Sequence, residues 1–126
     1  MSTPVGPYSP IVRAGSWLVC SGQLGLAPAG SDAAPALVPG GVGPQLTQAV
    51  ANAEALLAGE GASLGDVVKT TVFATDAADF PEVNEAYVAA FGGHRPARSM
   101  VAVSALPMGA AVEIEVWALA DRDRLD

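Results

Sequence analysis

The chain has 126 residues, which is enough for one domain and too few for two separate cores. Hydrophobic residues make up 51% of it and charged residues only 15%, against roughly 25% in an average soluble domain. A compact domain with so few charges cannot cover its whole surface with polar groups. We therefore expect part of the surface to be buried against further copies of the chain, the alternative being a hydrophobic monomer.

The formal net charge is −7, and the six basic residues form no run. Nucleic-acid-binding proteins usually carry a clustered basic stripe that displaces counterions from phosphates, so nucleic-acid binding is not expected. Each isolated cation is instead a candidate ligand for a small anion. The basic residues are Arg13, Lys69, Arg95, Arg98, Arg122 and Arg124.

A single cysteine, Cys20, excludes an internal disulfide and a cysteine-based metal site, and its strand-like neighbours predict a buried structural thiol. The first residues lack the basic and apolar regions of a signal peptide. The uncharged stretch of residues 99–112 is broken by Pro107 and Gly109 and cannot span a bilayer. These features predict a cytoplasmic protein with no membrane partner.

The first half of the chain predicts two strands, a loop and a helix. Residues 11–13 and 17–21 are rich in Val, Ile and Trp, as strands are, and the Ala, Pro and Gly of residues 27–41 predict a loop. Over residues 44–58, apolar side chains recur at i, i+3, i+4 and i+7 between a Gly-Pro start and Gly59. This pattern predicts an amphipathic helix.

The second half predicts a strand at residues 67–74 and a helix at residues 80–91, with Asp79 and Glu82 as a capping-box-like pair. Strands at residues 98–103 and 112–119 follow, joined by a turn at residues 106–109. The order β-β-α-β-α-β-β predicts a single α+β domain over residues 1–126, with both helices on one face of the sheet.

The last strand alternates between two kinds of side chain. One face carries Val112, Ile114 and Val116, and the other carries Glu113, Glu115 and Trp117. The apolar row is expected to face the helices. Two carboxylates and a tryptophan suit a cleft or a second subunit, although an ordinary solvated face is the alternative.

Arg98 follows a proline turn at the start of an uncharged strand. A guanidinium there needs an anionic partner, because burying a lone cation is costly. Its fork of N–H donors suits two-point binding of a carboxylate. The residues alone leave two partners open: Glu113 or Glu115 across the sheet, or the carboxylate of a ligand.

Other catalytic patterns are sparse. Ser21-Gly22 ends a strand and could present a hydroxyl and a close backbone to a ligand, although most such pairs are turns. The sequence has no Gly-x-Ser-x-Gly elbow, no phosphate loop and no cluster with metal-ligand spacing. The only histidine, His94, is expected to be solvated in a loop, which argues against a Ser-His pair or a histidine-held metal.

Six short segments, each weak alone, form a specific pattern in combination. They are Gly-Pro-Tyr-Ser-Pro at 6–10, Ser-Gly-Gln at 21–23, Gly-Asp-Val-Val-Lys-Thr-Thr-Val-Phe at 65–73, Asp-Phe-Pro-Glu-Val-Asn at 79–84, Pro-Ala-Arg-Ser at 96–99 and Val-Glu-Ile-Glu at 112–115. In this order the sequence resembles the RidA/YjgF family of enamine/imine deaminases, also labelled liver perchloric-acid-soluble protein. The resemblance covers nearly the whole chain.

The resemblance implies a chorismate-mutase-like fold with a mixed sheet, assembled as a homotrimer with three clefts between subunits. It implies hydrolysis of 2-aminoacrylate-type enamines and their imine tautomers to 2-keto acids and ammonia, with no cofactor. The expected partner is accordingly a small enamine, imine or 2-keto acid. A non-catalytic 2-keto acid binding protein and, less favoured by the charge, an endoribonuclease are the alternatives.

The resemblance also assigns residues. Arg98 would clamp the substrate carboxylate and Glu113 would handle water and a proton. Many relatives have cysteine at the position of Met100, so this residue is expected to alter the shape of the pocket and the substrate preference. The remaining substrate-binding positions are Tyr8, Ser21, Gly22 and Asn84.

Overall fold

The structure is a computed structural model that describes residues 6–28 and 34–120. Part of the predicted loop at residues 27–41 and the acidic tail with Arg122 and Arg124 lie outside the described residues. The strands are β1 (Ile11–Ala14), β2 (Trp17–Cys20), β3 (Gln23–Leu24), β4 (Val67–Ala74), β5 (Ala97–Ala102) and β6 (Val112–Leu119), and the helices are α1 (Val42–Ala58) and α2 (Phe80–Phe91). Among these residues, neither helix is long and apolar enough to cross a membrane.

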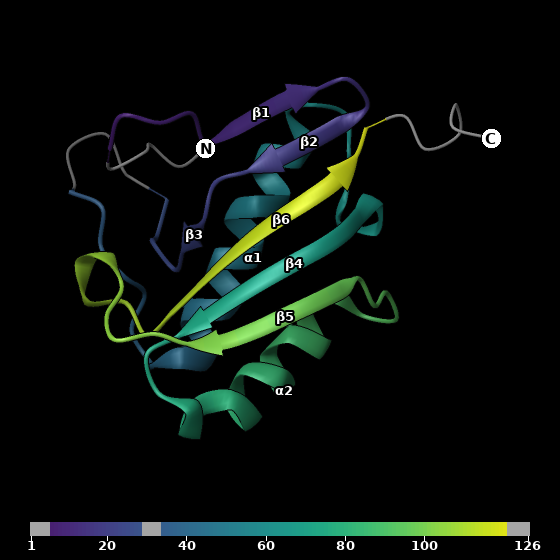
Figure 1. Ribbon diagram of the computed structural model, residues 1–126. Helices are drawn as coiled ribbons and strands as arrows, with labels where there is room; N and C mark the ends of the chain where they lie inside the picture. The colour runs from purple at the N-terminus through teal and green to yellow at the C-terminus, as the bar shows by residue number, and fades with distance from the viewer. Residues whose placement is uncertain (1–5, 29–33, 121–126) are drawn as a thin grey trace.

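The strands form one mixed sheet in the order β1-β2-β6-β4-β5, with both helices on one side of it (Figure 1). β4 and β5 pair in parallel, as their connection through α2 requires, and the other pairs are antiparallel. The prediction of a mixed sheet with two helices on one face is confirmed. The sequence did not predict β3, which pairs with β6 over two residues, too few for a periodic pattern.

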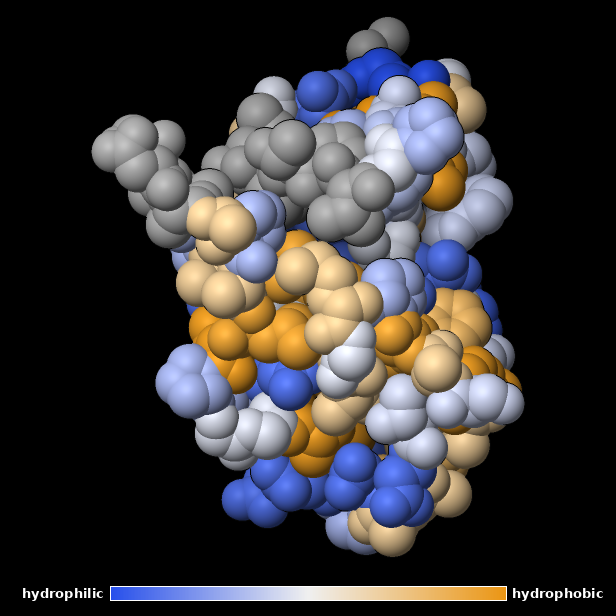
Figure 2. All heavy atoms as spheres, turned by 90° about the vertical axis from the view of Figure 1, so that its left-hand side faces the viewer, coloured by the Kyte–Doolittle hydropathy of each residue, from blue (hydrophilic) through white to orange (hydrophobic). Residues whose placement is uncertain are grey.

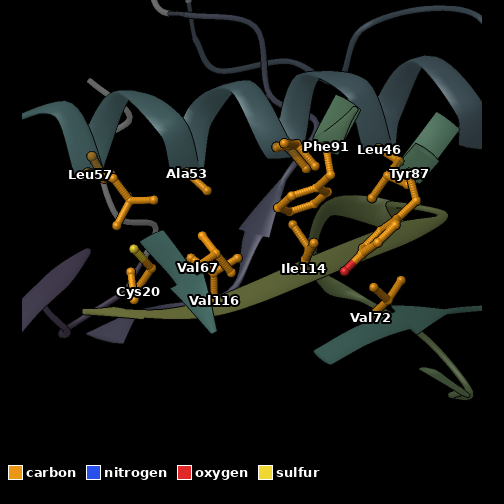
Figure 3. Packing of buried hydrophobic residues seen from close by; sticks show 14 of the residues in the cluster. Cys20, Leu46, Ala53, Leu57, Val67, Val72, Tyr87, Phe91, Ile114 and Val116 are labelled. Carbon is orange, nitrogen blue, oxygen red and sulfur yellow. The ribbon is translucent and has the colours of Figure 1, made fainter. Parts of the chain in front are cut away.

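The main hydrophobic core lies between the helices and the sheet (Figure 3). The predicted apolar row of β6 is fully buried there, and the alternate residues of the same strand are only half-buried or exposed. Burial of each such aliphatic side chain contributes roughly 1.5–3 kcal/mol. Cys20 is buried in the same core as predicted, and its burial raises the pKa of the thiol to about 11. The thiol is therefore protonated and inert at neutral pH.

The predicted capping box at the start of α2 is wrong. Asp79 already has helical backbone angles, because the 3-10 turn Ala77–Asp79 precedes the helix, and its side chain makes no capping bond. Asp76, in extended conformation before that turn, caps instead by accepting from Ala78 N at 2.9 Å. Glu82 accepts from the backbone N–H of Gly43 at 3.1 Å, so this carboxylate ties α2 to the first turn of α1.

His94 is not a solvated loop residue. Its Nε2 atom lies 2.7 Å from the backbone oxygen of Val67, and the side chain is half-buried beside the ring of Phe91. The contact fixes the loop between α2 and β5 to the start of β4. The only histidine of the chain thus has a backbone partner inside the fold.

Candidate functional site

The first half of the candidate site lies where α2 meets the edge strand β5. A cavity of about 280 Å³ is lined by Asn84, Tyr87, Val88, Arg95, Pro96 and Arg98. Two predicted substrate residues, Arg98 and Asn84, therefore share one cavity. Arg98 is exposed rather than enclosed by the fold, because β5 has a neighbouring strand on one side only.

The guanidinium of Arg98 is held by a buried tyrosine. Its central carbon lies 4.8 Å from the centre of the Tyr87 ring, in cation–π geometry. That ring is itself fixed, because the Tyr87 hydroxyl lies 2.9 Å from Thr70 Oγ1 and the ring packs on Phe91 with centroids 4.6 Å apart. Figure 3 shows Tyr87 in the layer between helix and sheet. A cation–π contact uses none of the N–H donors of a guanidinium as a conventional hydrogen bond to an oxygen, so these donors can still bind a ligand carboxylate.

The second half of the site lies at the end of the sheet where the N-terminal loop meets the last turn. A cavity of about 380 Å³ is lined by Gly6, Tyr8, Ser21, Gly22, Pro107, Glu113 and Glu115. It thus gathers four of the predicted residues. Figure 2 looks at this side of the molecule, where apolar residues spread over the middle of the surface. Tyr8, which lines the cavity, is itself exposed.

Gly22 admits the Glu113 carboxylate to this second cavity. A Cβ atom on Gly22 would lie 2.7 Å from the carboxyl carbon of Glu113, closer than such atoms approach in proteins. Ser21 holds the N-terminal loop in place, since its hydroxyl donates to the backbone oxygen of Ser9 at 2.7 Å and its backbone N–H donates to Pro10 O at 2.9 Å. The Ser-Gly pair thus fixes the N-terminal loop and also borders the second cavity.

The electrostatics of the second cavity favour a protonatable carboxyl. Partial burial and, to a smaller extent, the negative charge of Glu115 raise the pKa of Glu113 above its ordinary value. A carboxyl with a raised pKa exchanges protons closer to neutral pH than an exposed glutamate does. In the described part of the chain, no group of three His, Cys, Asp or Glu side chains could hold a metal ion.

Arg98 and Glu113 lie on opposite faces of the sheet. Arg98 is aligned with Thr70 of β4, which is fully buried under the helices, whereas Glu113 is aligned with Phe73. Positions an odd number apart on a strand point to opposite faces, so the two side chains are separated by the sheet itself. Within residues 6–28 and 34–120 there is no ion pair between Arg98 and Glu113 or Glu115. The internal partner that the sequence left open is not used.

Met100 lines neither of these two cavities. It is aligned with buried Val72 and packs, half-buried, against the main core.

Comparison with known proteins places the chain among its relatives. The family model described as Endoribonuclease L-PSP matches residues 1–120. The 2-iminobutanoate/2-iminopropanoate deaminase of Mus musculus is 44% identical over 115 residues, which are 91% of this chain and 82% of that protein. The chain belongs to the RidA/YjgF family.

Solved structures of the RidA/YjgF family agree with the fold. RidA from the Antarctic bacterium Psychrobacter sp. has a TM-score of 0.84 and 39% identity, over 93% of this chain and 91% of that one. E. coli TdcF, whose structure contains bound serine, has a TM-score of 0.80 and 34% identity, over 92% and 90% of the two chains. Both have the same arrangement of sheet and helices over nearly the whole chain.

The RidA/YjgF motifs did not reveal every residue of the two cavities. The motifs do not include Tyr87, which lies in the predicted helix at residues 80–91, although a tyrosine hydroxyl in a buried position usually has a hydrogen-bond partner. Arg95 was noted only as an isolated cation. Glu115 was recognised as a neighbour on the Glu113 face, but its effect on the pKa of Glu113 depends on the distance between them in the fold.

Proposed function

We propose that this chain is a hydrolytic deaminase that converts 2-aminoacrylate-type enamines, through their imine tautomers, into 2-keto acids and ammonia. One observation carries the proposal: the two faces of a single sheet each hold half of a site, Arg98 with Asn84 on one and Glu113 with Tyr8 and Gly22 on the other. The name of the mouse relative supports the reaction, and the serine in TdcF supports a ligand with an amino-acid skeleton.

Half-sites on opposite faces become one site only where two subunits meet. A ring of identical head-to-tail contacts brings Arg98 of one chain to Glu113 of the next, and the homotrimer proposed here has three such clefts. The face of the sheet without helices supports burial between subunits, because large apolar side chains are exposed on it. They are Val12, Trp17, Val101 and Trp117.

Arg98 positions the substrate. Two in-plane N–H groups of the guanidinium donate to the substrate carboxylate, while the Tyr87 ring below prevents the guanidinium from rotating. The carbon of the imine, next to the carboxylate, is thereby fixed relative to the edge of β5. Met100 shapes this edge from the core side and so affects which substrate side chains fit.

Glu113 of the partner subunit handles the water and the proton. It accepts a proton as the water oxygen bonds to the imine carbon, and it returns that proton to the nitrogen. This first transfer gives a carbinolamine, which carries a hydroxyl and an amino group on the same carbon. Glu113 then takes the hydroxyl proton and passes it to the amino nitrogen as the carbon–nitrogen bond breaks, so that ammonia leaves and the water oxygen remains as the keto oxygen. Tyr8, Ser21 and Gly22 border this carboxylate and orient the water and the leaving nitrogen. Because free imines already hydrolyse in water, the protein needs to accelerate the reaction only modestly. Orienting the substrate and transferring protons are enough for such an acceleration.

Mixing two inactive variants tests the shared site. Arg98→Ala and Glu113→Gln are each expected to lower keto-acid release at least about a hundredfold, with the enamine made in situ by a dehydratase. When the two variants are unfolded and reassembled together, a cleft can draw its arginine from one chain and its glutamate from the other. Random assembly in equal amounts restores about a quarter of the clefts.

The outcomes of the mixing experiment separate the possibilities. Recovered activity supports a cleft between subunits, whereas mixed samples that stay inactive contradict it. The reassembled wild-type protein serves as the control for refolding yield. If wild-type protein never accelerates keto-acid release but binds 2-keto acids through Arg98, the chain is a binding protein and the deaminase proposal fails.

The assembly has a separate test. The chain has a mass of 12.6 kDa, so light scattering on a trimer gives about 38 kDa. Trp117→Lys places a charge in the centre of the face without helices and is expected to shift the mass toward that of one chain. A wild-type mass near 12.6 kDa at micromolar concentration would remove the shared cleft.

A further inference from the structure

Two arginines share the smaller cavity, in a chain whose net charge is −7. Of the four basic residues that the structure describes, Arg13 pairs with Glu60 at 3.4 Å, and Lys69 donates to Ser99 at 2.8 Å. Arg95 and Arg98 have no carboxylate partner among the described residues. The cavity therefore concentrates positive charge that the rest of the described chain does not neutralise.

Arg95 is held in place without using all its donors. Its Nη1 atom donates to the backbone oxygens of Gly92 and His94, at the carbonyl end of α2. No hydrogen bond from its Nε or Nη2 atoms to another described residue is found. The fixed guanidinium can thus cap the helix and still donate to a ligand in the cavity.

We propose that Arg95 binds a second carboxylate, so that the preferred substrates are imines of dicarboxylic amino acids and their 2-keto diacid products. This inference rests on the proposed function, in which Arg98 takes the carboxylate next to the imine. Val88 and Pro96 offer apolar walls for the methylene groups between the two carboxylates, and Asn84 offers an amide. A substrate with two carboxylates bridges both guanidinium groups within the 280 Å³ cavity.

The electrostatics favour a dianion over a monoanion. Two guanidinium groups bordering one small cavity repel each other, and a single carboxylate on Arg98 leaves the charge of Arg95 unpaired. A second carboxylate removes that repulsion and adds a charge-assisted hydrogen bond. The alternative role for Arg95 is only to cap α2, in which case its loss affects all ligands equally.

Calorimetry with stable 2-keto acids tests the proposal. For the wild-type oligomer, 2-oxoglutarate or oxaloacetate is expected to bind at least about tenfold more tightly than 2-oxobutanoate. Arg95→Gln keeps the size and hydrogen-bonding character but loses the charge, and it is expected to lower this ratio of Kd values about tenfold. Arg13→Gln, which removes the same charge far along the chain beside Glu60, is the matched control and is expected to keep the wild-type ratio.

Two outcomes overturn the inference. Either the wild type shows no preference for the diacids, or Arg95→Gln leaves the ratio of Kd values unchanged, as it would if the variant weakened the binding of both ligand classes equally. Keto-acid release from in situ imines separates this failure from that of the proposed function. Arg98-dependent hydrolysis of 2-iminobutanoate without a diacid preference contradicts only the proposed carboxylate site at Arg95. A diacid preference that depends on Arg95, without hydrolysis of any imine, supports the carboxylate site at Arg95 and contradicts the proposal that the chain is a deaminase.

Discussion

The two faces of the sheet differ in what their residues do, although they are built from the same strands. Along β6, the residues that face the helices are completely buried, and the residues between them carry the two carboxylates and Trp117. The side chains on the helix-covered face form the core. The exception is Arg98 on the edge strand β5, which lines a cavity together with residues of α2. A single alternating pattern thus serves stability on one side and, in the function proposed above, chemistry on the other.

The largest expected difference between the faces concerns stability. Ile114→Ala removes a fully buried side chain under α1 and is expected to lower the free energy of unfolding by about 3–4 kcal/mol. The next residue, Glu115→Ala, is expected to change it by less than about 1 kcal/mol. Urea denaturation at one fixed protein concentration measures both, and equal losses would contradict the division of roles between the faces.

Gly22→Ala tests the other face by displacing one side chain. A Cβ atom there would meet the Glu113 carboxyl group at 2.7 Å, so the carboxylate has to move away from its position in the cavity. We expect kcat/KM for imine hydrolysis to fall about 10- to 100-fold, with a change in unfolding free energy below about 1 kcal/mol. Gly93→Ala is the matched control, because a Cβ atom on Gly93 meets nothing within 4 Å.

Thr70→Val tests whether the buried hydrogen bond between Thr70 and Tyr87 helps to position Arg98 at the edge of the sheet. It removes the buried partner of the Tyr87 hydroxyl and is expected to cost about 1–2 kcal/mol of unfolding free energy and to raise KM several-fold through a looser Arg98. Combining it with Tyr87→Phe should cost less than the sum of the single changes, because no buried hydroxyl then lacks a partner. Thr71→Val, on the other face, is the control, and an equal KM increase in it would refute the support by Tyr87.

The smallest expected effect is a shift in pH dependence. A raised pKa means that the Glu113 carboxylate is lost at a higher pH than in an ordinary glutamate, so activity that needs the carboxylate falls early on acidification. Glu115→Gln removes one cause of the increase and is expected to move the acid limb of the kcat/KM profile to lower pH. A limb that stays in place would show that Glu113 is not the titrating group.

The sequence alone determined nearly all the elements and named six of the residues that line the two cavities of the candidate site: Tyr8, Ser21, Gly22, Asn84, Arg98 and Glu113. Period-2 and period-3.6 patterns located both helices and five of the six strands, since side-chain periodicity depends on local geometry. The sequence-based predictions failed for side chains whose hydrogen-bond partner lies far away along the chain. The Glu82 carboxylate bonds to α1 rather than to its own helix, and His94 bonds to β4.

Only the tertiary structure decided how the site residues are distributed. The sequence could place Arg98 and Glu113 near each other in one sheet, but the alignment of β5 with β4 and of β4 with β6 puts them on opposite faces. Register is set by pairing between strands that are far apart in the chain, and a shift of one residue would reverse the face. For this reason the residue types of the candidate site can be predicted from the sequence. The division of the site into two half-sites depends on how the strands pair in the folded sheet.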